Sequence, residues 1–459
     1  MSANLPIQKV FNQILAEKVT SALSGKLDGK FVAVTYPAGF NYGVTYGLSA
    51  FYNEQTLSTM DSTIQTDADG IVSISDQRLS SLLALVLKAA PYIFSKATEK
   101  QLNEWDEAAQ AQIAAVLSAF TDCGFKFTDP IPRGGRLNDV LTQLKSEYGK
   151  PDASYSNLPI YLAPLKSALL AYQAKASQAL KLRERATEAD EVRDNAILNI
   201  KNPTKDNGAL ETGEASYYVG FDKLPTANQL IGSLGTSENK LTIHISGDSF
   251  SGNDCKVHME GGGTVSVPIL GLFGITASGS SQVDVGAYTS ERTSFSIDIT
   301  YPGLTTVGVV PKALSPDHQQ GWYPLSILQE IQEKTGNDNV DGYKLAGTEF
   351  SVETLFGPKG RLNYLKTLVI SQEPSIDITF KEINIDEFRK HVHADDSVKV
   401  KLFGFITLGS VKHSYTMDQI NFNENSKSVT LHLGAPNVSG TIPLEQQVAH
   451  LLGGVPAYT

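Results

Sequence analysis

Two closely spaced histidines are the first residues whose types and spacing could do chemistry. His391 and His393 are separated by one residue, and Asp395 follows them. On a β-strand, residues i and i+2 point to the same side, so both imidazoles would face a single metal ion. The pattern predicts either a metal site formed by His391 and His393 or a pair of surface histidines beside a turn. It indicates no cofactor.

A serine in the middle of the chain is a candidate nucleophile. The segment Gly247-Asp248-Ser249-Phe250 resembles the nucleophile block of the GDSL hydrolases, which implies a hydrolase acting through Ser249. In that family the block lies near the start of the domain and an Asp-x-x-His pair lies near its end. Here the block is in the middle of the chain, and no Asp-x-x-His follows it. Since Gly, Asp, Ser and Asn favour turns, we prefer a hairpin turn and keep Ser249 as the alternative.

An apolar hairpin is the candidate contact segment. Alternating residues in VSVPILGLFGITASGS, beginning at Val265, predict either ordinary core strands or a hairpin that inserts into a membrane with one face toward lipid. The contact residues would be Val265, Val267, Ile269, Leu272 and Phe273.

An aromatic pair is the second contact candidate. Trp322 and Tyr323 follow the loop SPDHQQG. They would either form an exposed pair for a sugar or a lipid headgroup or plug the end of a β-sandwich, and we prefer the plug.

Composition limits the class of protein. The chain has 459 residues, a net charge of -11 and only two cysteines, Cys123 and Cys255. A disulfide scaffold is therefore excluded, and a general affinity for nucleic acid is not expected because a basic surface is missing. The N-terminal residues show no secretory signal, so we expect cytoplasmic synthesis, with export by a non-classical route left open.

The first half of the chain reads as mainly helical. We expect a mixed α/β segment over 1–74, a helical bundle over 75–200 and a linker over 201–216. The bundle would contain one long helix over 164–200, since that stretch after Pro164 has no internal Gly or Pro. The linker is rich in Pro, Gly, Asn and charge and has no apolar period.

The second half reads as two tandem antiparallel β-sandwich-like domains, 217–336 and 337–459. Apolar and polar residues alternate in stretches such as 241–246 and 295–301, as expected for strands with one buried side. The segment LFGITASGS at 272–280 returns as LFGFITLGS at 402–410, and 243–246 and 297–299 resemble 376–379 and 429–431. Each domain is expected to end in a short helix that begins with a proline, Pro324 or Pro443.

These observations favour a non-enzymatic binding or assembly protein. A toxin-like, membrane-active form that rearranges from a soluble to an inserted state is a special case of this hypothesis. The alternatives are a hydrolase with a site in a β domain, at Ser249 or a His/Asp cluster, and a self-assembling structural protein. The expected partners are a second copy of the chain or another protein, with a membrane lipid or a glycan as further candidates and no nucleic acid.

Overall fold

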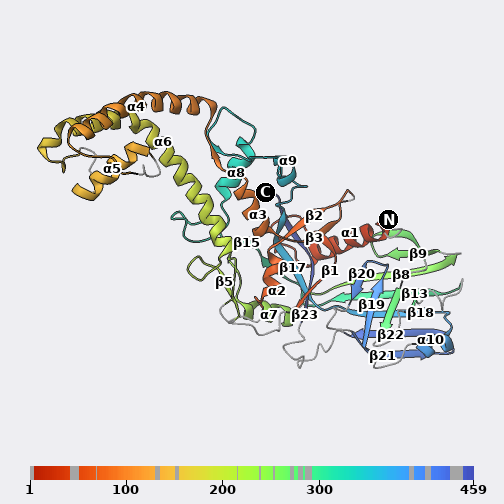
Figure 1. Cartoon of the computed structure of the whole chain (residues 1–459). Coiled ribbons are helices and arrows are strands. Elements are labelled where there is room, and N and C mark those ends of the chain that lie inside the picture. The colour runs from red at the N-terminus through yellow and green to blue at the C-terminus, as the bar shows by residue number, and fades with distance from the viewer. Residues whose placement is uncertain are drawn as a thin grey trace. The chain divides into compact units, whose positions relative to one another are not determined.

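The chain is a mixed α+β protein that divides into two compact units. The computed structural model describes residues 5–41, 51–68, 70–129, 135–149, 155–213, 216–236, 239–251, 254–268, 273–277, 283–284, 292–391, 397–408, 415–434 and 448–459. Unit 1 comprises Met1–Val86, Ala196–Pro324 and Phe350–Thr459, and unit 2 comprises Leu87–Asn195 and Leu325–Glu349. The chain therefore enters unit 1 three times (Figure 1).

The smaller of the two main sheets in unit 1 closes on itself. Its strands lie in the order β14 (Thr305–Gly308), β17 (Tyr364–Gln372), β2 (Ser62–Thr66), β3 (Val72–Arg78), β1 (Val32–Asn41) and β23 (Val448–Ala457). Strand β17 also pairs with β23, so β17, β2, β3, β1 and β23 form a ring. Strand β23 is hydrogen-bonded on both sides, to β1 and to β17.

The larger sheet of unit 1 has eleven strands. In spatial order they are β10 (Gly263–Pro268), β9 (Asp254–Met259), β8 (Leu241–Ser251), β13 (Ser294–Tyr301), β18 (Ser375–Lys381), β22 (Ser428–Gly434), β21 (Tyr415–Asn423), β19 (Ser397–Leu402), β11 (Phe273–Ala277) and β12 (Val283–Asp284), with β20 (Ile406–Leu408) on β19. Every described pairing in this sheet is antiparallel. Figure 1 shows β8, β13, β18 and β22 side by side.

One side of this sheet forms the main core of unit 1. Burial alternates strictly along β13, where Phe295, Ile297, Ile299 and Tyr301 are buried. The apolar face of α1 (Leu5–Ala22) packs into the same core, which also contains Ile378 of β18. Alternation with period two places all the apolar side chains on one side, so the intervening polar side chains lie on the other.

Smaller elements complete unit 1. The helices are α2 (Glu54–Met60), α3 (Leu79–Lys88, through Val86), α7 (Ala227–Thr236), α9 (Val352–Leu355) and α10 (Ile385–His391). The short strands are β5 (Leu210–Gly213), β6 (Ser216–Tyr218), β7 (Phe221–Asp222) and β15 (Val310–Pro311).

Unit 2 is mainly helical. Its helices are α4 (Lys96–Asp122), α5 (Gly135–Tyr148), the short η1 (Ile160–Leu162), α6 (Ala163–Lys201, through Asn195) and α8 (Leu325–Lys334), and β4 (Tyr92–Ile93) pairs with β16 (Gly342–Tyr343). A core that includes Phe120 of α4, Leu144 of α5 and Leu165 of α6 holds the three long helices together. The long helix predicted over 164–200 corresponds to α6.

The strand pairing differs from two tandem sandwich domains over 217–336 and 337–459. Strand β13 from the first segment pairs with β18 from the second, so both segments contribute to one sheet. Pairing removes two exposed strand edges, which is the physical reason for a merged sheet. The expected linker over 201–216 also contains β5 and the start of β6.

One expected helix, and the first residues of another, are strands instead. Residues 448–457, which we expected to continue a helix begun at Pro443, form β23, whose first eight residues are all buried. A strand buried on both sides gives a continuous apolar run, which periodicity alone does not separate from a buried helix. Residues 75–78, assigned to the helical bundle, belong to β3.

A buried carboxyl group joins α3 to the rest of unit 1. Asp61 accepts hydrogen bonds from the Ser80 backbone N–H (2.9 Å), the Ser80 hydroxyl (2.5 Å) and the Tyr218 hydroxyl (3.2 Å). Burial raises the pKa of Asp61 to about 6, because desolvation disfavours the charged form more than these hydrogen bonds and Arg78 favour it. Ionisation of Asp61 therefore requires more free energy in the folded protein than in the unfolded chain.

The stability of the protein should accordingly depend on pH through Asp61. Between its ordinary pKa of 3.8 and the folded value of about 6, the folded state binds more protons than the unfolded state. The contribution of Asp61 to the free energy of unfolding therefore falls as the pH rises, by up to about 3 kcal/mol in total. Urea unfolding from pH 4 to pH 7 should show a steeper decline for the wild type than for Asp61→Asn.

The control for this measurement is Asp206→Asn, which changes an exposed carboxyl group in unit 1. It should leave the wild-type pH profile unchanged. Parallel profiles for the wild type and Asp61→Asn would contradict the assignment.

Candidate functional site

The outward side of the eleven-stranded sheet carries the chemistry of unit 1. We call it the polar face and define it on its four central strands. Its members are Thr242, His244, Ser246, Asp248, Ser294, Ser296, Asp298, Thr300, Ser375, Asp377, Thr379, Lys381, Ser428, Thr430 and His432. All of them are partly or fully exposed in the structure, in contrast to the buried residues that alternate with them.

Four charged or ionisable side chains form a row across this face. In the strand register His244 lies opposite Asp298, Asp298 opposite Asp377, and Asp377 opposite His432. The Nδ1 atom of His244 is 2.7 Å from Oδ1 of Asp298, and the Nδ1 atom of His432 is 2.7 Å from Oδ1 of Asp377. Like charges directly opposite each other destabilise a sheet, so the carboxylates of Asp298 and Asp377 disfavour this pairing. The contacts with His244 and His432 offset that repulsion.

The row lies on a local two-fold relation within the sheet. The pentapeptide SIDIT occurs at 296–300 in β13 and again at 375–379 in β18, and the two copies pair with each other in register. The flanking strands match as well, TIHI at 242–245 in β8 and TLHL at 430–433 in β22. The two related halves of the sheet are thus joined edge to edge, with the Asp298–Asp377 pair at their boundary.

This relation is not the repeat inferred from the sequence alone. The comparison in sequence order matched 243–246 with 376–379 and 297–299 with 429–431. In the structure 296–300 corresponds to 375–379 and 242–245 to 430–433, so the matching strands follow a different order along the chain in the two halves. A search for identical short peptides would have found SIDIT twice. The other repeated segment predicted from the sequence also pairs with its own copy. Strand β11, in the copy at 272–280, pairs antiparallel with β19, which contains the start of the copy at 402–410, and Phe273 lies opposite Leu402.

A third histidine on the same side of the sheet forms a hydrogen-bonded chain. The Nδ1 atom of His258 is 2.6 Å from the Thr264 hydroxyl, and its Nε2 atom is 3.2 Å from Oδ1 of Asp248. The chain links β10, β9 and β8. A hydroxyl, an imidazole and a carboxylate in this order have the connectivity of a nucleophile, a base and the group that orients the base.

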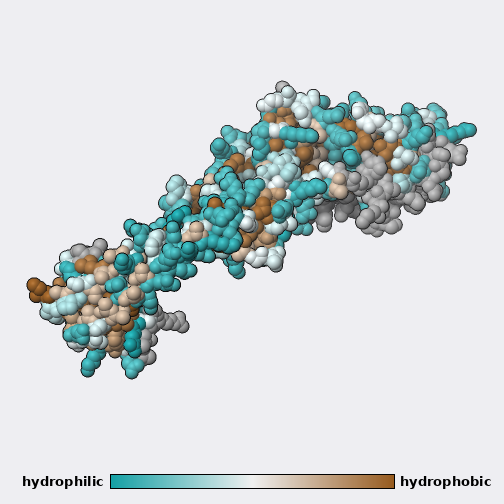
Figure 2. All heavy atoms as spheres, turned by 90° about the horizontal axis from the view of Figure 1, so that it is seen from above, coloured by the Kyte–Doolittle hydropathy of each residue, from teal (hydrophilic) through white to brown (hydrophobic). Residues whose placement is uncertain are grey.

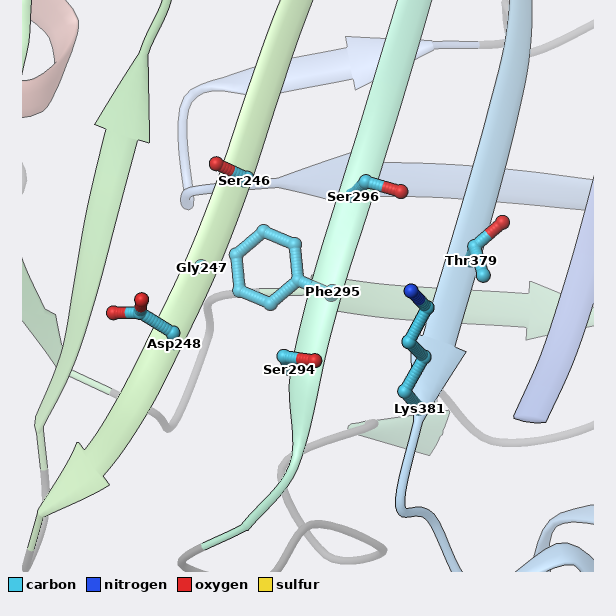
Figure 3. A pocket seen from close by; sticks show the side chains of 8 residues that line it. All are labelled: Ser246, Gly247, Asp248, Ser294, Phe295, Ser296, Thr379 and Lys381. Atoms are coloured by element: carbon cyan, nitrogen blue, oxygen red, sulfur yellow. The ribbon is translucent and has the colours of Figure 1, made fainter. Parts of the chain in front are cut away.

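A cavity of about 240 Å³ opens on the polar face beside these pairs. Figure 3 shows the residues that line it, which are Ser246, Gly247, Asp248, Ser294, Phe295, Ser296, Thr379 and Lys381. Gly247 is required by close packing, since a Cβ atom there would lie 2.0 Å from Cε1 of Phe295. The Phe295 ring therefore occupies the space of the missing side chain (Figure 3).

Four polar side chains around the cavity have no partner among the described residues, whereas Thr379 is hydrogen-bonded to Thr430 and Asp248 to His258. Within the part of the chain that the structure describes, the hydroxyls of Ser246, Ser294 and Ser296 make no hydrogen bond and Lys381 makes no ion pair. The Lys381 ammonium is turned toward β13, whereas the Asp248 carboxylate points away from it (Figure 3), toward its partner His258. Among the described residues, the cavity thus presents an unpaired ammonium and three serine hydroxyls without a hydrogen-bond partner.

The predicted catalytic and metal residues lie largely outside the described residues, so their arrangement stays a prediction. Ser249 belongs to β8, but its side chain lies outside the described residues, as does the whole of His393. His391 is the last residue of α10, so the strand geometry expected for the His391–His393 pair is not found at His391. The acidic residues Asp386 and Glu387 occupy the first turn of that helix, where the positive end of the helix dipole favours them.

Three of the seven predicted contact residues are buried. Val267, Phe273 and Trp322 are each at most 2% exposed, and Val265 and Tyr323 are partly buried. The Trp322 indole N–H donates to the backbone carbonyl of Gly220 at 2.6 Å. Ile269 and Leu272 lie outside the described residues. A membrane contact by Val267 or Phe273 would therefore require the sheet to open.

No other feature of the described residues assigns a function. They contain no cluster of three or more His, Cys, Asp or Glu side chains arranged for a metal ion, and no helix among them has the length and apolarity to cross a membrane. In the view of Figure 2, hydrophobic residues form small separate patches in a mainly hydrophilic surface. Comparisons with protein-family models, curated proteins and solved structures found no match to this chain.

The row of four side chains yields a thermodynamic prediction. Replacing both histidines, in His244→Ala/His432→Ala, should lower the free energy of unfolding by about 0.5–1 kcal/mol because Asp298 and Asp377 are left facing each other. Adding Asp298→Asn should recover most of the loss. The loss should also shrink in 1 M salt, which screens exposed charges. Urea unfolding at low and high salt measures all three effects.

His258→Ala is the matched control, because it removes a His–Asp pair in which the carboxylate of Asp248 lies opposite Lys256 rather than another acid. Its effect should not be recovered by removing a carboxylate. If Asp298→Asn fails to restore stability in the double-histidine variant, the two carboxylates do not repel as inferred.

Proposed function

We propose that this protein is a non-catalytic binding protein whose polar face recognises a carbohydrate. The observation that carries the proposal is the cavity of about 240 Å³ with three serine hydroxyls that lack a hydrogen-bond partner among the described residues. Burying such groups under an apolar ligand would leave them unsatisfied, at a cost of about 1–3 kcal/mol each. A ligand with many hydroxyl groups satisfies them.

The regularity of the polar face supports the same class of ligand. Neighbouring strands lie about 4.8 Å apart, so the side chains in each row repeat at that spacing. The row next to the four charged side chains contains Ser246, Ser296, Thr379 and Thr430 in register. These hydroxyls both donate and accept hydrogen bonds, as sugar hydroxyls do. The cavity volume lies just below the range of about 300–1,000 Å³ for drug-sized ligands, which suits a single sugar residue.

The binding test uses the full chain on a glycan array. We expect a restricted set of glycans to bind the wild type, and Thr379→Val to weaken binding of the best glycan by about tenfold or less, the range for one lost hydrogen bond. This substitution removes a hydroxyl from the cavity wall and keeps the branched shape of the side chain. Isothermal titration calorimetry gives the two affinities.

Thr242→Val is the matched control, since Thr242 has the same chemistry on the same face but does not line the cavity. It should bind the glycan as tightly as the wild type. A chain that binds no glycan on the array, or equal losses in both variants, would sink the proposal.

A hydrolase is the second candidate, favoured by the Thr264–His258–Asp248 chain. In this hypothesis the His258 imidazole accepts the proton of the Thr264 hydroxyl, whose oxygen attacks an ester carbonyl and forms an acyl-enzyme as the C–O bond to the alcohol breaks and His258 protonates the leaving alcohol. Water, deprotonated by His258, then attacks the acyl group, releases the acid and restores the Thr264 hydroxyl. Self-association and the membrane-active form stay predictions from the sequence.

The hydrolase hypothesis predicts turnover of 4-nitrophenyl acetate that depends on both residues. Thr264→Val and His258→Gln should each lower the rate at least a hundredfold, the lower end of general-base contributions. A surface imidazole alone also hydrolyses this ester slowly, so turnover by itself does not identify the nucleophile. The hypothesis therefore requires in addition that mass spectrometry detects an acetyl group on Thr264. A rate that persists in Thr264→Val would exclude Thr264 as the nucleophile.

A further inference from the structure

We infer that the cavity of the polar face selects an acidic sugar, one that carries a carboxylate or a sulfate, through the Lys381 ammonium. This inference rests on the proposed function and specifies its ligand. Lys381 lines the cavity and has no ion-pair partner among the described residues, while its ammonium is turned toward β13 (Figure 3).

The acidic groups nearby are already engaged. Asp248 is hydrogen-bonded to His258, Asp298 to His244, and Asp377 to His432. In the register of β13 and β18, Lys381 lies opposite Ser294, and in that of β18 and β22 it lies opposite Ser428. Its immediate cross-strand neighbours are therefore hydroxyls, and the positive charge is left for a ligand. In a chain with a net charge of -11, such a local cation is needed to hold an anion.

Lys381 has no basic counterpart under the local two-fold relation of the sheet. Under the register that matches the two SIDIT copies, Ser296 corresponds to Ser375 and Thr300 to Thr379, so the cavity hydroxyls of Ser296 and Thr379 each have a hydroxyl counterpart in the other half. The counterpart of Lys381 is Pro302, and that of Ser294 is Glu373. The cation at the cavity thus has no counterpart at the matching position of the other half, as expected for a site that holds a single anionic group.

A charge-assisted hydrogen bond has the strength to set the preference. Hydrogen bonds to charged groups contribute more than neutral ones, and an ammonium donates up to three of them. An oxyanion that accepts from Lys381 would sit beside Ser294 and Ser296, whose hydroxyls can donate to its remaining lone pairs. The neutral form of the same sugar would leave the ammonium without a counter-charge.

The test compares charged and neutral forms of the same sugars. The array should carry uronic acid, sulfated and neutral versions of each glycan, and titration calorimetry should follow with one uronic acid glycan and its methyl ester. We expect the free acid to bind about ten- to a hundredfold more tightly than the ester in the wild type. Lys381→Met should remove this preference and leave binding of the ester nearly unchanged.

Lys256→Met is the matched control, because it removes the same charge from β9 of the same sheet at a position that does not line the cavity. It should retain the preference for the acid. Strong binding of sulfated but not carboxylated glycans would keep the role of Lys381 and identify sulfate as the anionic group.

The outcomes separate this inference from the function on which it rests. If neutral and acidic forms bind equally, or if Lys381→Met keeps the preference, the inference is wrong and the carbohydrate-binding proposal stands. If no glycan binds in any form, the proposed function itself fails.

Discussion

The in-register pairing of β13 with β18 is the constraint on which the rest of unit 1 depends. It joins two groups of four strands, β10–β9–β8–β13 and β18–β22–β21–β19, into one continuous sheet. A shift of this pairing by one residue would turn Ile376 and Ile378 out of the core and Asp377 into it. The hydrophobic side chains on both strands therefore fix the register, and the register in turn fixes every neighbour on the polar face.

The same register creates the polar chemistry. It places Asp298 and Asp377 opposite each other, and His244 and His432 balance that arrangement from the flanking strands. It also places Lys381 beside Ser294 on the edge of the cavity. The arrangement of the polar face is thus a consequence of how the core is packed, because the apolar residues fix the alignment of the strands and the polar residues between them follow it.

The local features of the fold were predictable from the sequence. The long helix α6 lacks internal Gly and Pro, and the alternation at 295–301 marks β13, so short-range patterns suffice for both. The choice of strand partner was not predictable, since alternation indicates which side is buried but not which strand lies next to it. For this reason the direct repeat comparison paired the wrong segments, and the row from His244 to His432 was missed although each of its residues stood in a recognisable strand.

The candidate site was harder to predict than the fold. Ser249 and the His391–His393 pair attracted attention because they are close in sequence, whereas the cavity collects Ser246, Ser296 and Lys381 from three separate strands. The prediction of a helix at β23 was wrong for a different reason. The helical appearance of this strand came from a run of apolar residues such as Leu451 and Leu452, which are both buried although successive side chains of a strand point to opposite faces.

The position of β23 has a consequence for biosynthesis. Strand β23 lies between β1 and β17, and Val32 pairs with Gly454. A ribosome releases β1 long before this partner exists, since synthesis proceeds at about 5–20 residues per second. The nascent β1 therefore has an unpaired edge until β23 has been synthesised, so the ring closes late and a chain that stops before β23 keeps a strand edge able to recruit other chains.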